Sequence, residues 1–167
     1  SNTIFGYLAG VNIASGGNYN CLIGNNSGND ITTGDFNIAI ASYNALHKLT
    51  TGARNMAIGA GSLTTADGAE SDNIAIGVDA LSNANNDSTV KNIAIGNYAL
   101  DAIGTNAQTG TIAIGHQSLS ALAGGTNNTA IGYLSAKLLT GGSNNTVLGF
   151  QALDAADGTE TGNVVIG

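Results

Sequence analysis

The stretch that decides the fold is NIAIGNYAL, which runs from Asn92 to Leu100. Related segments recur along the whole chain, and their starts fall at residues 2, 20, 37, 55, 73, 92, 111, 128, 145 and 163, so successive copies are 17 to 19 residues apart. A fixed short period of this kind is typical of a solenoid. The sequence therefore predicts about nine coils and the beginning of a tenth, forming a single repeat domain over residues 1–167.

Each copy is numbered here from its first residue, which is called position zero. Position three is large and apolar in every copy, and position four is Gly in nine of ten, which predicts a short strand ended by Gly. Ordering about 18 backbone residues costs roughly 18 to 36 kcal/mol, whereas burying three or four aliphatic side chains returns about 5 to 12. One coil cannot fold alone, so we expect a parallel β-solenoid in which equivalent strands pair along the axis.

Position zero is the most regular polar position, with Asn in nine of ten copies and Thr111 in the remaining one. Stacked Asn side chains at one corner can hydrogen-bond the backbone of the neighbouring coil. We expect this structural role in preference to contact with a ligand.

The second half of each copy leaves two conformations open. Leu is frequent at position eight, and Ile, Leu or Ala occupies position eleven. Residues three apart point to opposite sides of a straight strand. Either the chain turns between them, as in a roll with two short strands per coil, or one helical turn intervenes, as in a leucine-rich repeat. The short period favours the roll, since strand-plus-helix repeats usually take about 20 to 29 residues.

The two faces of the strand are both apolar. If positions one and three fill the coil interior, position two faces outwards as a stripe of small residues, which soluble monomers seldom expose. This stripe predicts self-association, and its central members are Ala39, Ala57, Ala75, Ala94, Ala113 and Ala130. The alternative is that the alanine column packs within its own coil.

The pattern Asn-x-Ala-Ile-Gly-x-x-Ala-Leu, with Gly and Asn turns between copies, resembles the YadA-like β-roll head repeats of trimeric autotransporter adhesins. It is equally similar to the Asn-Thr-Ala-Ile-Gly arrays of phage tail fibres and bacterial surface proteins. The resemblance covers the whole chain and implies a homotrimer with an adhesive or shaft role. The adhesin-head copy is nearer 14 residues than the 17 to 19 found here, so the extra residues enlarge the coil or its outer loop.

Composition and motifs disfavour several functions. Four Lys and Arg against 11 Asp and Glu give a net charge of −7, which argues against binding nucleic acid. No apolar run approaches the ~20 residues of a membrane span. His47 and His116 lack partnering residues at catalytic or metal-binding spacing, so we expect no enzyme, no cofactor and no metal. Two groups of acidic residues occupy equivalent turns, and we interpret them as solvated: Asp67, Glu70 and Asp72, then Asp154, Asp157 and Glu160.

Aromatic residues gather just after the strand Gly. Their candidate role is contact with a receptor or glycan, and an equally weighted alternative is to cover the seam between subunits; the residues are Tyr7, Tyr98, His116, Tyr133 and Phe150. The sequence thus predicts a non-enzymatic rod segment of an extracellular trimeric fibre, on a virion tail or a bacterial cell surface. An ice-binding solenoid is the alternative, although the Thr residues occupy mixed positions.

Overall fold

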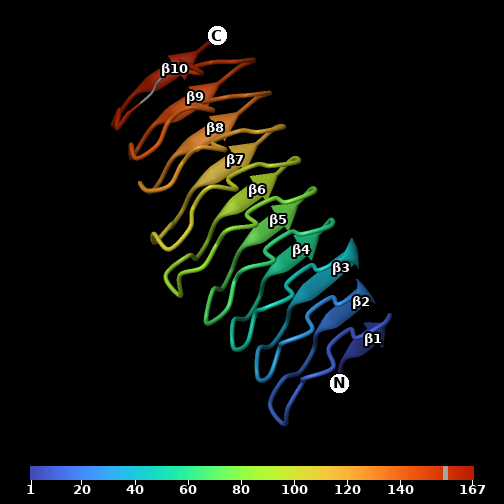
Figure 1. Ribbon diagram of the computed structural model, residues 1–167. Coiled ribbons are helices and arrows are strands. Elements are labelled where there is room, and N and C mark those ends of the chain that lie inside the picture. The colour runs from blue at the N-terminus through green and yellow to red at the C-terminus, as the bar shows by residue number, and fades with distance from the viewer. Residues whose placement is uncertain (156–157) are drawn as a thin grey trace.

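The computed structural model describes residues 1–155 and 158–167. The fold is an all-β solenoid of about nine turns whose ten strands form one parallel sheet in sequential order (Figure 1). The strands are β1 (Thr3–Phe5), β2 (Cys21–Asn25), β3 (Ile38–Tyr43), β4 (Met56–Ile58), β5 (Ile74–Ile76), β6 (Ile93–Ile95), β7 (Ile112–Ile114), β8 (Thr129–Ile131), β9 (Thr146–Leu148) and β10 (Val164–Ile166). The predicted fold class and period are confirmed. No described residue belongs to a helix, so the described chain contains none that could cross a bilayer.

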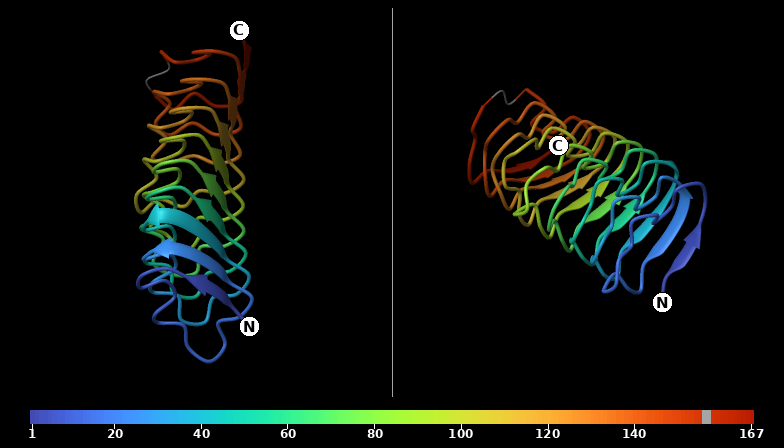
Figure 2. Two further views of the ribbon diagram at one scale, coloured as in Figure 1. Left: turned by 90° about the vertical axis from the view of Figure 1, so that its right-hand side faces the viewer. Right: turned by 60° about the horizontal axis from the view of Figure 1, so that its bottom comes forward.

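Equivalent positions pair from coil to coil. Ile74 is opposite Ile93, Ala75 opposite Ala94 and Ile76 opposite Ile95, and the same register continues along the sheet. The sheet therefore runs along one side of an elongated stack (Figure 2). The third copy is the exception, because it carries one extra residue: β3 extends to Tyr43, and the pairing with β2 shifts between Ile23 and Asn25.

The strand faces are the reverse of those expected. In β4 to β7 the alanine of position two is buried, whereas the residues of positions one and three are only partly buried. The predicted outward stripe is therefore wrong, since its six members are 0% exposed within a single chain: Ala39, Ala57, Ala75, Ala94, Ala113 and Ala130. They cannot contact another subunit, and the alternative, in which they pack within their own coil, is confirmed.

The second half of the coil consists of turns. The position-four carbonyl accepts a hydrogen bond from the position-seven amide, as from Ala99 to Gly96 (3.2 Å), and position eight accepts from position eleven, as from Leu122 to Leu119 (3.1 Å). Positions six and eight have positive φ, and Leu119 is at 52°. Two successive tight turns thus bring the side chains of positions eight and eleven to the same interior, where Leu119 and Leu122 are fully buried. Neither the expected second strand nor a helical turn forms; outside the named strands, the described residues contain only isolated bridges such as Ser71 to Val90.

The asparagines of position zero form a buried ladder. Asn73 Oδ1 accepts from the Asn92 backbone amide (3.0 Å), while Asn73 Nδ2 donates to Asn55 Oδ1 (3.2 Å) and to the Thr89 carbonyl (2.8 Å). Each of these side chains is at most 1% exposed. Because the amide bonds both the neighbouring coil and the closing turn, the predicted structural role is confirmed.

Thr111 interrupts the ladder. Its backbone amide still donates to Asn92 Oδ1 (3.0 Å), but its hydroxyl bonds Gln108 Oε1 (3.4 Å), and no amide contact joins it to Asn128 in the described structure. We expect Thr111→Asn to raise the free energy of unfolding by about 1 kcal/mol, because it adds one or two buried hydrogen bonds. Denaturant melts followed by circular dichroism measure this, with Thr111→Val as the control of similar shape. An unchanged or lower midpoint for Thr111→Asn would contradict the ladder's role.

Candidate functional site

The outward face of the sheet is an apolar strip. It consists of positions one and three of the ten strands, and none of these twenty residues is charged. Its members are Thr3, Phe5, Cys21, Ile23, Ile38, Ile40, Met56, Ile58, Ile74, Ile76, Ile93, Ile95, Ile112, Ile114, Thr129, Ile131, Thr146, Leu148, Val164 and Ile166. Central members are half-buried against one another, whereas Leu148 is 45% exposed. This outer strip is thus uncharged along the length of the rod, and it is apolar except at Thr3, Thr129 and Thr146.

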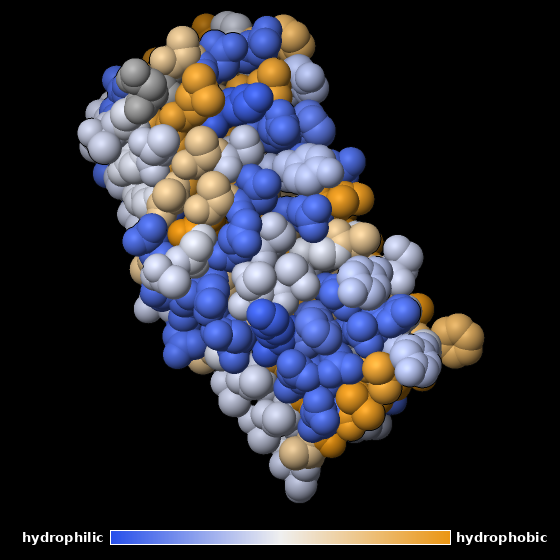
Figure 3. Space-filling model, viewed as in Figure 1, coloured by the Kyte–Doolittle hydropathy of each residue, from blue (hydrophilic) through white to orange (hydrophobic). Residues whose placement is uncertain are grey.

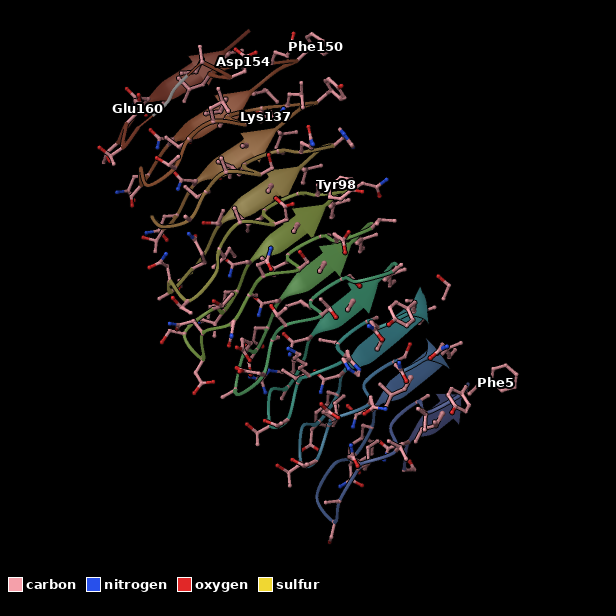
Figure 4. All side chains as sticks on the ribbon, in the orientation of Figure 1. Phe5, Tyr98, Lys137, Phe150, Asp154 and Glu160 are labelled. Atoms are coloured by element: carbon pink, nitrogen blue, oxygen red, sulfur yellow. The ribbon has the colours of Figure 1, made fainter. Side chains whose placement is uncertain are left out.

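An aromatic ladder lies beside the outer strip, just past the strand ends. His116 and Tyr133 stack with ring centroids 5.6 Å apart, Tyr133 and Phe150 stack at 5.4 Å, and Tyr98 meets His116 edge-on at 6.0 Å. Figure 4 shows Tyr98 and Phe150 along the side of the rod where the strand arrows end. In Figure 3 apolar residues reach this same right-hand edge of the molecule. The structure therefore brings four of the five candidate aromatic residues together.

Ring geometry limits what the aromatic ladder can bind. His116, Tyr133 and Phe150 are nearly parallel, with interplanar angles of 14° and 10°, so the inner ring faces cover one another. A ligand that stacks on a ring face is left only the end faces of the ladder, whereas a surface that packs on ring edges can contact every rung. Tyr7 stands apart in the first coil and is 72% exposed. The stacked geometry thus leaves few ring faces of the aromatic ladder free for a stacking ligand.

Three carboxylates converge where the turns that end the fourth and fifth coils, here called coil closures, lie next to each other. Ligand oxygens of Asp67, Glu70 and Asp87 all lie within 4.8 Å of one another. Glu70 is 0% exposed, although Asp67 and Asp87 are exposed. Burial raises the pKa of Glu70; the hydrogen bond from the Gly68 amide opposes that shift, and the carboxylates of Asp67 and Asp87 add to it. This acidic closure is an unusual concentration of negative charge around one buried group.

The other acidic residues of the two predicted turns behave differently. Asp72 is not part of this cluster and pairs with Arg54, whose Nη2 lies 3.0 Å from Asp72 Oδ2. That guanidinium lowers the pKa of Asp72. Asp154 and Glu160 do not form a comparable group with a third ligand among the described residues, and Asp157 lies outside them.

Sequence reasoning missed two of these features. Asp87 belongs to the closure one coil beyond Asp67 and Glu70, 20 and 17 residues later in the chain. The one-coil offset is itself the signal that could have found it, because residues about 18 apart are neighbours in this solenoid. The outer strip was missed because its large residues were expected inside.

The remaining surface offers no enclosed site: no pocket is detected in the part of the chain that the structure describes. Comparisons with protein-family models, with curated proteins and with solved structures return no match for the chain.

Proposed function

We propose that this chain is a non-enzymatic rod segment of an extracellular homotrimeric fibre, a phage tail fibre or a bacterial surface adhesin, that holds a host- or surface-binding face. The observation that carries the proposal is the outer strip, an uncharged and largely apolar face that follows all ten strands. Apolar patches of a few hundred Å² or more mark interaction surfaces on soluble proteins. The likeness of the repeat to trimeric fibre heads supports threefold closure.

The dimensions of the outer strip suggest which neighbours join the interface. The nine intervals between the ten strands, at about 4.8 Å each, and a width of about 10 Å give a strip of roughly 430 Å². A standard interface covers about 800 Å² per partner. The strip alone supplies about half of this area, so we place the adjacent aromatic ladder at the rim of the seam, where ring edges pack against the next subunit.

Rigidity follows from the stacking. Each strand from β2 to β9 pairs with the strands of the preceding and following coils, and the buried Asn ladder joins the coils at one corner. In a trimer, weak contacts with a surface receptor or glycan would be presented three at a time, and this multivalency raises the overall avidity.

Two substitutions of equal exposure test the interface. Leu148 in the outer strip and Leu138 on the turn side of the coil are both 45% exposed. We expect Leu148→Glu to shift the protein from trimer towards monomer at micromolar concentration, because each seam would bury unpaired carboxylates. Leu138→Glu should leave the trimer unchanged. Light scattering coupled to size-exclusion chromatography reports both masses, and equal behaviour of the two variants would remove the strip from the interface.

A further inference from the structure

We propose that the acidic closure, formed by Asp67, Glu70 and Asp87, is a binding site for one hard divalent cation, with calcium the best match. The ion would join the closure of the fourth copy, which supplies Asp67 and Glu70, to that of the fifth, which supplies Asp87. This assignment revises the sequence-based interpretation of Asp67 and Glu70 as part of a solvated turn.

The first argument is the buried oxygen of Glu70. Glu70 Oε2 accepts a hydrogen bond from the Gly68 amide (3.0 Å), but Oε1 is buried without a hydrogen-bond partner among the described residues. A carboxylate oxygen that is withdrawn from water and left unpaired destabilises the folded state. One oxygen of Glu70 lies within 4.8 Å of an oxygen of each of the other two carboxylates, so a cation bound at Glu70 would also be attracted by two further anions.

The second argument is the backbone around the acidic closure. Asp87 Oδ1 accepts from the Ala69 amide (2.9 Å), and a Cβ at Gly68 would clash with that same carboxylate oxygen. Gly68 therefore leaves the space that the Asp87 carboxylate occupies. Asn85, oriented with its NH₂ towards Asp67, donates to both oxygens of that carboxylate at 2.7 and 2.9 Å. These two hydrogen-bond donors thus hold the exposed carboxylates of Asp67 and Asp87 beside the buried carboxylate of Glu70, although the three negative charges repel one another.

The chemistry of the donor set selects the ion. Three carboxylates offer only hard oxygen ligands, which suit calcium or magnesium and not the softer transition metals. Magnesium requires nearly ideal octahedral geometry, whereas calcium accepts irregular sets of six to eight oxygens at varied angles. Carboxylates from two turns of different length form an irregular set, and water can complete the coordination from the exposed side.

The test is a calcium titration of the purified chain after treatment with EGTA. Isothermal titration calorimetry should show one calcium per chain, and 10 mM calcium chloride should raise the melting temperature by roughly 3 to 10 °C if Kd lies in the 10⁻⁴ to 10⁻³ M range of extracellular sites. Sodium chloride at equal ionic strength controls for charge screening. Glu70→Gln and Asp87→Asn should lose both the heat of calcium binding and the rise in melting temperature. Asp72→Asn, which changes a residue of the same turn that is not part of the acidic closure, should keep both.

The variants also separate ion binding from simple repulsion. Glu70→Gln removes a buried charge, so its melting temperature in EGTA should equal or exceed that of the unmodified chain. If Glu70→Gln is stabilised in this way while calcium neither binds to nor stabilises the unmodified chain, Glu70 carries a proton instead of binding a metal ion. The proposal is then overturned. Equal calcium shifts in the unmodified chain and in Glu70→Gln would overturn it as well.

Discussion

Gly96→Ala is expected to lower the free energy of unfolding by roughly 3 to 6 kcal/mol, from backbone strain together with overpacking. Gly96 has φ of +130°, which L side chains rarely adopt, and a Cβ there would lie 2.6 Å from the carbonyl carbon of Gly115 in the next coil. The neighbour is backbone within the stack, so it cannot move aside without separating the coils. Urea melts followed by far-ultraviolet circular dichroism give the change.

Gly124→Ala is the matched control. No heavy atom lies within 4 Å of a Cβ built on Gly124, and its φ lies outside the left-handed region. We expect a change within about 0.5 kcal/mol, as for a surface substitution. If Gly96→Ala were tolerated equally well, the close approach of coils at position four would be refuted.

Position four already contains one natural exception. Ala41 replaces Gly in the third copy, but that copy has an extra residue and β3 continues past this point to Tyr43. Ala41 is not among the residues with positive φ. Alanine is therefore accommodated only where the chain has the length to take another path, which agrees with the cost expected at Gly96.

Asn73→Ala is the second substitution for which we expect a large effect, a loss of about 2 to 5 kcal/mol in the free energy of unfolding. The Asn92 amide and the Thr89 carbonyl would each lose the side-chain partner that Asn73 provides, in a part of the coil closed to water. Each buried polar group left unpaired costs about 1 to 3 kcal/mol. Thermal and urea melts measure the loss.

Asn83→Ala provides the comparison for Asn73→Ala. Asn83 also donates to a neighbouring coil, at 2.6 Å from the Asp101 carbonyl, but it is exposed, so water can replace the amide. We expect a loss of less than about 1 kcal/mol. Similar losses at Asn73 and Asn83 would show that burial of the ladder contributes nothing.

The fold could be predicted because its evidence is periodic. The recurrence of Gly and Asn at positions four and zero determined the coil boundaries, and stacked Asn side chains have few ways to satisfy their amides other than bonding the next coil. The aromatic residues after the strand Gly were likewise recognisable as a column. Their stacking could not be predicted, because ring orientation depends on the backbone turn at positions five and six.

The orientation of the strand was mistaken because residue size was used to decide which face lies inside. In this narrow coil the apolar side chains of positions eight and eleven, such as Leu119 and Leu122, occupy the interior, so the strand contributes a small residue. Two coils carry the signal. Ile4 and Leu22 occupy position two where position eight is Gly10 or Gly28, whereas Ala57 accompanies Leu63. A Cβ on Gly28 would lie 2.7 Å from Leu22 Cδ2, so positions two and eight share one volume.

The acidic closure lay beyond sequence reasoning for a different reason. Coil closures vary in length, so the position of an acidic side chain relative to the next coil cannot be read from the period alone. Asp72 and Glu70 are two residues apart, yet one pairs with Arg54 in solvent and the other is buried beside Asp87. Only the path of the backbone through the turn separates these outcomes.

Sedimentation equilibrium of the unmodified chain tests most directly whether copies of this protein cover one another's outer strip. The account predicts a single species of three times 16.5 kDa at micromolar concentration. A mass of 16.5 kDa that persists as the concentration is raised would contradict it, because the apolar face would then stand in water without a partner.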